Sequence, residues 1–140
     1  MQMPAISRFM TARPWTIERT ATLADAHELM RDHKIRHLPV VDRGELCGIL
    51  SERDLLFYET RSEARPESVP VELVMTENPF IVTSDMPLDE VAEIMGSHRY
   101  GSVVVVGRDG VEGIFTATDA CQAFARILRD AEREALMAGS

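Results

Sequence analysis

The spacing of apolar residues predicts the same order of secondary-structure elements twice along the chain. A pair containing β-branched residues follows a proline at 16–17 and again at 81–82, which favours a short strand. Further along, the runs HLPVV (37–41) and SVVVV (102–106) are continuously apolar. Such runs are typical of strands that are buried on both faces.

A hairpin and a second helix complete each copy. The turn sequences DRGE and GRDG follow the apolar runs, and LCGIL (46–50) and VEGIF (111–115) then fit the second strands of hairpins. A helix start follows at Ser51 and at Thr116. With a helix before each apolar run, the predicted order per copy is β-α-β-β-α.

The helix before each apolar run shows helical periodicity. Thr22 and Asp25 have capping-box spacing in the first copy, and Pro87 stands near the first turn in the second. The apolar positions are Leu23, Ala26, Leu29 and Met30 in the first copy and Leu88, Val91, Ala92, Ile94 and Met95 in the second. Both helices are therefore expected to cover a core with this apolar face.

The two copies form an internal repeat. GILSERD begins at Gly48 and GIFTATD at Gly113, an offset of 65 residues, and the same offset aligns residues 6–56 without a gap. Matched pairs include Met10 with Met75, Thr11 with Thr76, Pro14 with Pro79, Met30 with Met95, His33 with His98, and Arg43 with Arg108. Repeats of this size usually bury their apolar faces against each other.

The repeat sets the expected domain organisation. We expect one unit at 6–58, a linker at 59–70, a second unit at 71–128 and a helical extension at 129–140. The linker is charged, contains two prolines and is too short for the units to move apart. Along the last helix, Phe124, Ile127, Leu128 and Ala131 recur at helical spacing; this face is expected to pack on its own unit or to form a subunit interface.

Composition restricts the possible partners. The formal net charge of −8 argues against nonspecific binding to nucleic acid or an anionic membrane, and requires a local positive site for any phosphate. No apolar stretch approaches the length of a membrane span, and the N-terminal residues do not resemble a signal peptide. Cys47 and Cys121 lack the spacing of a disulfide framework or zinc site, which favours reduced thiols and a cytoplasmic location.

These residues resemble the CBS domain, the module named after cystathionine β-synthase. MTARPWTI, TLADAHELM, IRHLPVVD and GILSERDL carry the resemblance in the first copy, and MTENPFIV, PLDEVAEIM, VVVV and GIFTATD carry it more loosely in the second. The resemblance implies an α+β fold in which two β-α-β-β-α units pack as a pseudo-two-fold pair, a Bateman module. It also implies two clefts that bind AMP, ADP, ATP, NAD or S-adenosylmethionine, a regulatory role, and a homodimer formed through helices.

The repeated phrase has two interpretations. Ser51 with Asp54, and Thr116 with Asp119, have capping-box spacing, and a helix cap alone would explain them. A helix N-terminus also suits an anion, and an aspartate in the first turn can accept hydrogen bonds from a ribose diol. In the CBS family the matching residues contact ribose and phosphate, so the same helix start is able to serve both purposes.

Basic residues distinguish the two copies. KIRH precedes the buried strand in the first copy, where RYGS stands in the second. Lys34, Arg36, His37 and Arg53 are candidate phosphate contacts by resemblance, or else solvated charges at the ends of elements. If they bind phosphate, the cleft with the basic residues should prefer charged nucleotides.

Adenine requires an apolar slot. The candidates for it are Ile17, Ile35 and Leu38 in the first copy and Val82, Tyr100 and Val103 in the second; the alternative for each is a place in the core.

Motifs for catalysis are absent from the sequence. It contains no metal-binding His/Cys spacing, nucleophile motif or phosphate-binding loop of the P-loop type. We therefore expect a protein with no catalytic residues, metal or required cofactor, which senses an adenosine ligand and acts on an unknown effector protein in trans. The alternative is a structural or dimerisation module that binds no ligand.

Overall fold

The computed structural model describes residues 2–139, and its element order matches the repeat predicted from the sequence. The first half contains β1 (Thr11–Ala12), β2 (Ile17–Glu18), α1 (Leu23–His33), β3 (His37–Asp42), β4 (Glu45–Ser51) and α2 (Glu52–Glu59). The second contains β5 (Thr76–Glu77), β6 (Ile81–Val82), α3 (Leu88–His98), β7 (Ser102–Gly107), β8 (Gly110–Thr116) and α4 (Ala117–Ala138). Short 3₁₀ turns lie at Ile6–Arg8, Pro66–Ser68 and Val71–Leu73.

The predicted α+β fold is confirmed, and two short strands add to it. The orders β2-α1-β3-β4-α2 and β6-α3-β7-β8-α4 are those expected from the apolar pattern. Strands β1 and β5 were not predicted, because Thr11–Ala12 and Thr76–Glu77 lack the pair of residues after a proline that marked the strands at 16–17 and 81–82.

These two strands exchange between the halves. One sheet has the order β2-β3-β4-β5 and the other β1-β8-β7-β6. Strand β1 from the first half pairs antiparallel with β8, placing Ala12 opposite Gly113. Strand β5 from the second half pairs with β4, placing Glu77 opposite Gly48. Each sheet therefore contains one strand that belongs to the other repeat.

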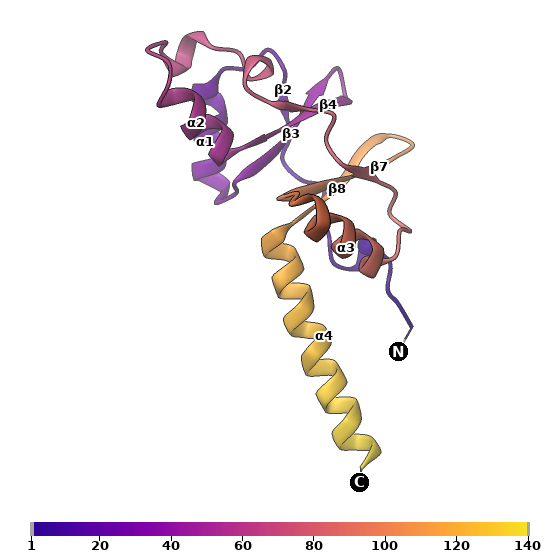
Figure 1. The fold of residues 1–140 in the computed structure, drawn as a ribbon. Helices are drawn as coiled ribbons and strands as arrows, with labels where there is room; N and C mark the ends of the chain where they lie inside the picture. The colour runs from indigo at the N-terminus through magenta and orange to yellow at the C-terminus, as the bar shows by residue number, and fades with distance from the viewer. Residues whose placement is uncertain (1, 140) are drawn as a thin grey trace.

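The two cores follow the same exchange. Ile6 is completely buried in the core below β7 and β8, with Val91, Val103 and Phe115. Val71 is completely buried in the other core, with Leu23, Leu38 and Leu50 among others. Figure 1 shows the two lobes side by side, joined by the crossing segments. The halves thus complete each other's cores.

The helix periodicity predicted from the sequence is largely confirmed. Leu23, Ala26 and Met30 of α1 and Leu88, Val91 and Met95 of α3 are buried, whereas Ala92, expected among the apolar positions of α3, is exposed. The Thr22–Asp25 capping box is present, and Pro87 is the N-cap residue of α3.

Helix α4 continues well past the body of the molecule (Figure 1). Ala123 is buried and Ile127 packs against the second core, but every residue from 128 to 139 is exposed. Phe124 is 64% exposed and Leu128 53%. Packing on its own unit therefore accounts for only part of the apolar surface of this helix.

Candidate functional site

Both repeated phrases form complete capping boxes. The Asp54 backbone N–H donates to Ser51 Oγ at 3.0 Å, and the Ser51 N–H donates to Asp54 Oδ2 at 3.0 Å. At the second helix start, the Asp119 N–H donates to Thr116 Oγ1 at 3.2 Å, and the Thr116 N–H donates to Asp119 Oδ2 at 2.9 Å. The capping role expected from the spacing is confirmed at both positions.

Each cap leaves a small set of groups for a ligand. The N–H of the first helical residue already donates to a carbonyl, that of Arg36 for α2 and of Gly101 for α4. The next N–H, of Arg53 or Thr118, has no hydrogen-bond partner among residues 2–139. The cap hydroxyl accepts one bond and keeps its own hydrogen to donate. Each start thus offers one N–H, one hydroxyl hydrogen and a carboxylate.

The exchanged segment brings the first half of the chain to the second cap. Thr11 Oγ1 lies 3.4 Å from both carboxylate oxygens of Asp119. By contrast, the second oxygen of Asp54, Oδ1, has no partner within the described residues. The Asp119 cap therefore faces a boundary between the halves, as a cleft between two units requires.

Side chains from the exchanged segments fill the space beside Gly48 and Gly113. A Cβ at Gly48 would collide with the side chain of Met75, and one at Gly113 would collide with that of Met10. Both methionines belong to the exchanged segments. The missing side chains of the two glycines therefore leave room for the segment that comes from the other half. Each copy needs both a Met-Thr pair, which packs on the other copy, and a Gly-Ile pair, which receives it.

His37 lies between the two helix starts. It stands opposite Ser51 in the β3–β4 register, and its Nε2 lies 3.5 Å from the position that a Cβ at Gly101 would occupy. Burial lowers the pKa of His37, and the neighbouring Arg36 lowers it further, while the charges of Asp54 and Asp119 oppose the shift. The neutral imidazole is thus favoured in the absence of an anion.

The other candidate phosphate contacts are exposed. Lys34 ends α1 in the left-handed conformation (φ 54°), with its N–H donating to the Met30 carbonyl. The carbonyl of Arg36 accepts the Glu52 N–H, and Arg53 lies in the first turn of α2. Both side chains are exposed and form no ion pair with any described residue. The structure thus places positive charge at the start of α2.

The candidate adenine residues divide into two groups. Ile17, Leu38, Val82 and Val103 are buried in the two cores, and Leu38 and Val103 are completely so. Ile35 is partly buried, and Tyr100 is 42% exposed and packs near His98 and Phe80. Ile35 and Tyr100 are the candidates that still present substantial surface to a ligand.

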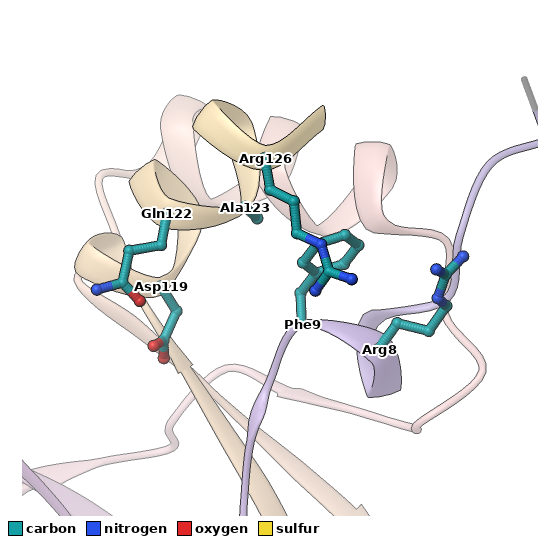
Figure 2. Close-up of a pocket in the computed structure, with 6 residues that line it drawn as sticks. All are labelled: Arg8, Phe9, Asp119, Gln122, Ala123 and Arg126. Carbon is teal, nitrogen blue, oxygen red and sulfur yellow. The ribbon is translucent and has the colours of Figure 1, made fainter. Parts of the chain in front are cut away.

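A pocket that the sequence reasoning missed adjoins Asp119. Figure 2 shows it between the start of the chain and the first turns of α4, with a cavity volume of about 180 Å³. It is lined by Arg8, Phe9, Asp119, Gln122, Ala123 and Arg126. The helical residues follow Asp119 at spacings of three, four and seven, which place them on one face and were readable in the sequence. The place of Arg8 in this pocket was not readable in the sequence, because Arg8 comes close to α4 only through the strand exchange.

The described residues show no metal site or membrane span. No cluster of three or more His, Cys, Asp or Glu side chains suited to a metal ion occurs within residues 2–139. No helix in that range combines the length and apolar character that crossing a membrane requires.

Comparison with known families agrees with this architecture. The model of the CBS domain matches residues 6–60 and 71–126. The chain belongs to the CBS domain family. The structure is accordingly a CBS pair, as the sequence motifs indicated.

Curated relatives include small CBS proteins and larger enzymes. The chain is 27% identical to the CBS domain-containing protein YhcV of Bacillus subtilis, over 84% of this chain and 83% of YhcV. It is 30% identical to inosine-5′-monophosphate dehydrogenase of Aquifex aeolicus, over 79% of this chain but only 22% of the dehydrogenase. The likeness to the enzyme is thus confined to a small part of it.

Solved structures share the whole CBS pair. A Vibrio cholerae protein described as AcuB, for acetoin utilization, is similar with a TM-score of 0.84 and 35% identity, over 94% of this chain and 98% of that one. The CBS pair of MJ0100, in complex with 5′-methylthioadenosine and S-adenosyl-L-methionine, gives 0.79 and 27%, over 89% and 98%. CBSX2 in complex with AMP gives 0.75 and 28%, over 89% and 98%.

Proposed function

We propose that this CBS pair is a regulatory protein that binds an adenosine-containing ligand in the clefts between its halves. Ser51 with Asp54, and Thr116 with Asp119, would contact the ribose and phosphate. AMP, ADP, ATP, NAD and S-adenosylmethionine are the candidate ligands. The bound complexes of MJ0100 and CBSX2 support this class of ligand.

The observation that carries the proposal is that the N-termini of α2 and α4 keep hydrogen-bonding groups that their caps do not satisfy. Each cap keeps an N–H, a hydroxyl hydrogen and a carboxylate after its internal bonds are made. Asp119 also faces Thr11 from the other half. A ribose diol donates to carboxylate oxygens, and a phosphate accepts from N–H and hydroxyl groups, so the available groups complement both parts of a nucleotide.

Positive charge at the first cap supports a preference for phosphorylated ligands. Arg53 lies in the first turn of α2, the Arg36 carbonyl accepts the Glu52 N–H, and Lys34 precedes Arg36 by two residues; all three are exposed. The charges of Asp54 and Asp119 both act on the pKa of His37. Ile35 and Tyr100 would contact adenine at the edges of the cores. Arg36 and His37 would then add phosphate contacts for which the aligned Gly101 and Ser102 have no counterpart.

We further propose that the chain acts as a homodimer on an effector protein in trans, in the cytoplasm. A ligand that binds one conformation more tightly shifts the population that the effector meets. The exposed apolar side chains Phe57 and Phe124 on α2 and α4 support an interface formed by helices.

The cysteines support the proposed cytoplasmic location. Cys47 and Cys121 are free thiols, as in a reducing compartment. The matched enzymes contain this region as a small part, which supports regulation rather than catalysis.

The test combines a ligand panel with substitutions at the caps. Isothermal titration and thermal shifts with the five ligands should reveal at least one that binds the wild-type chain. At 100 times its dissociation constant, it should add about 2.7 kcal/mol of stability. Asp54→Asn and Asp119→Asn keep a cap oxygen but remove the charge, and should each weaken binding in their own cleft by about ten-fold or more.

Asp25→Asn is the matched control. Asp25 forms the same capping box with Thr22 at the start of α1. Its substitution should lower stability by a similar amount, about 1 kcal/mol or less, and leave affinity unchanged. Absence of binding by all five ligands to the wild-type chain would refute the sensor role and favour the ligand-free interaction module.

A further inference from the structure

The pocket beside Asp119 brings two arginines together at the junction of distant chain segments. Arg8 comes from the 3₁₀ turn at the start of the chain, and Arg126 from the second turn of α4 after Asp119. Figure 2 shows the Arg126 side chain extending toward Phe9, with Arg8 at the far side of that residue. Long side chains on a helix lean toward its N-terminus, which directs this guanidinium toward the Asp119 end.

Both guanidinium groups lack an internal counter-ion. Neither arginine forms an ion pair with any residue in the range 2–139. Their Cζ atoms lie 6.0 and 5.7 Å from the centre of the same Phe9 ring. The carboxylate in the pocket wall, Asp119, forms no ion pair with either arginine, and its Oδ2 accepts the Thr116 N–H. Two unpaired positive charges therefore share one pocket of a chain whose net charge is −8.

The internal repeat provides a comparison for this pocket. At the offset of 65 residues, Leu73 replaces Arg8, Val74 replaces Phe9 and Phe57 replaces Gln122. Leu73 and Phe57 are 68% and 59% exposed, so exposed apolar side chains stand at the positions of Arg8 and Gln122.

Arg61, the arginine that corresponds to Arg126, already contacts its own helix. Arg61 lies 3.6 Å above the Phe57 ring and donates to the Phe57 carbonyl at 3.2 Å. It is thus held against its own helix, whereas Arg126 extends into a pocket with a second arginine. The two helix starts have the same cap but different electrostatic surroundings.

We propose that Arg8 and Arg126 bind the phosphate of a nucleotide whose ribose is held by Asp119, and so make this cleft selective for phosphorylated adenosine ligands. The proposal rests on the nucleotide-binding function proposed above. Guanidinium groups bind phosphate through strong, directional hydrogen bonds. Phosphate selectivity at Asp119 then comes from the N-terminal turn and α4, in addition to any contribution from the KIRH segment.

The experiment compares phosphorylated and unphosphorylated ligands. AMP and adenosine are titrated into the wild type, Arg8→Gln, Arg126→Gln and the double variant, with Asp54→Asn present in every protein to weaken the other cleft. The double variant should bind AMP at least about ten-fold more weakly, while adenosine affinity changes less than about two-fold. The loss of AMP affinity with added salt should also be shallower than in the protein with both arginines.

Arg61→Gln, at the position equivalent to Arg126, is the control and should leave AMP affinity unchanged. An equal loss of AMP and adenosine affinity in the double variant, or an equal effect of Arg61→Gln, would overturn the proposal. If neither AMP nor adenosine binds, the proposed nucleotide function fails, and inorganic pyrophosphate then tests the pocket alone. Pyrophosphate binding that the double variant loses would support the arginine pair as a phosphate site; no binding would refute it.

Discussion

The imidazole of His37 lies in the electrostatic field of Asp54 and Asp119, although these aspartates belong to different halves of the chain. The sequence pattern placed His37 among several basic residues at the start of a buried strand, but could not show how deeply its imidazole is buried. In the structure His37 is partly buried, whereas the neighbouring Arg36 is exposed. Burial and the Arg36 charge lower its pKa more strongly than the two carboxylates raise it.

This shift predicts a pH dependence of stability. The folded-state pKa of His37 lies below the ordinary value of 6.5, so the unfolded chain binds more protons as the pH falls through that range. The stability contribution is therefore fully present above pH 6.5 and is lost as the pH falls toward the folded-state pKa. Urea unfolding of the ligand-free protein between pH 7.5 and 5.5 should show the wild type losing more stability than His37→Asn. A difference between the two proteins that stays constant over this range would contradict the assignment.

At the scale of elements, the strand exchange depends on close contacts at two glycines. Met10 precedes β1 and packs where Gly113 lacks a side chain, and Met75 does the same before β5 at Gly48. The contacts differ in one respect. The position of a Cβ at Gly48 also lies 3.0 Å from the Thr76 carbonyl oxygen, whereas the nearest atoms at Gly113 all belong to the Met10 side chain.

This difference predicts an asymmetric pair of double-mutant cycles. Gly113→Ala should destabilise the protein by about 1–3 kcal/mol through overpacking, and Met10→Ala should recover much of that loss. Gly48→Ala should be recovered less by Met75→Ala, because backbone cannot move aside as a side chain does. Chemical denaturation of the single and double variants measures both coupling energies. Equal recovery at the two glycines, or none at Gly113, would argue against this packing.

The same elements show what could be predicted from sequence. Helix caps at Thr22, Ser51 and Thr116, and the strands at 37–41 and 102–106, follow from local spacing and burial, and were predicted. Strands β1 and β5 each pair with a strand of the other repeat, Thr11 with Ile114 and Glu77 with Gly48, so local spacing could not show either strand or its partner. The arginine pocket was missed for the same reason, because Arg8 reaches α4 only through the exchange.

At the scale of the whole molecule, the exchange joins the two halves into one structure. Ile6 completes the second core and Val71 the first, so neither sequence repeat holds all of its own apolar core. Helix α4 is the exception, since its last turns leave the body and contact neither core (Figure 1). Its exposed apolar face is the surface on which the proposed homodimer depends.

The dimer proposal predicts a specific change in mass. Phe124 and Leu128 lie one helical turn apart on this face, and Phe124→Glu with Leu128→Glu places two charges there in a chain that is already acidic. Light scattering after size exclusion should show a dimer for the wild type and a monomer for the double variant. Leu136→Glu, 70% exposed in the wild type but on a different face of α4, is the control and should remain dimeric. Because both substituted side chains are already exposed, the variant should keep its fold by circular dichroism. A wild type that is monomeric at all concentrations, or a double variant that remains dimeric, would show that α4 does not form the interface.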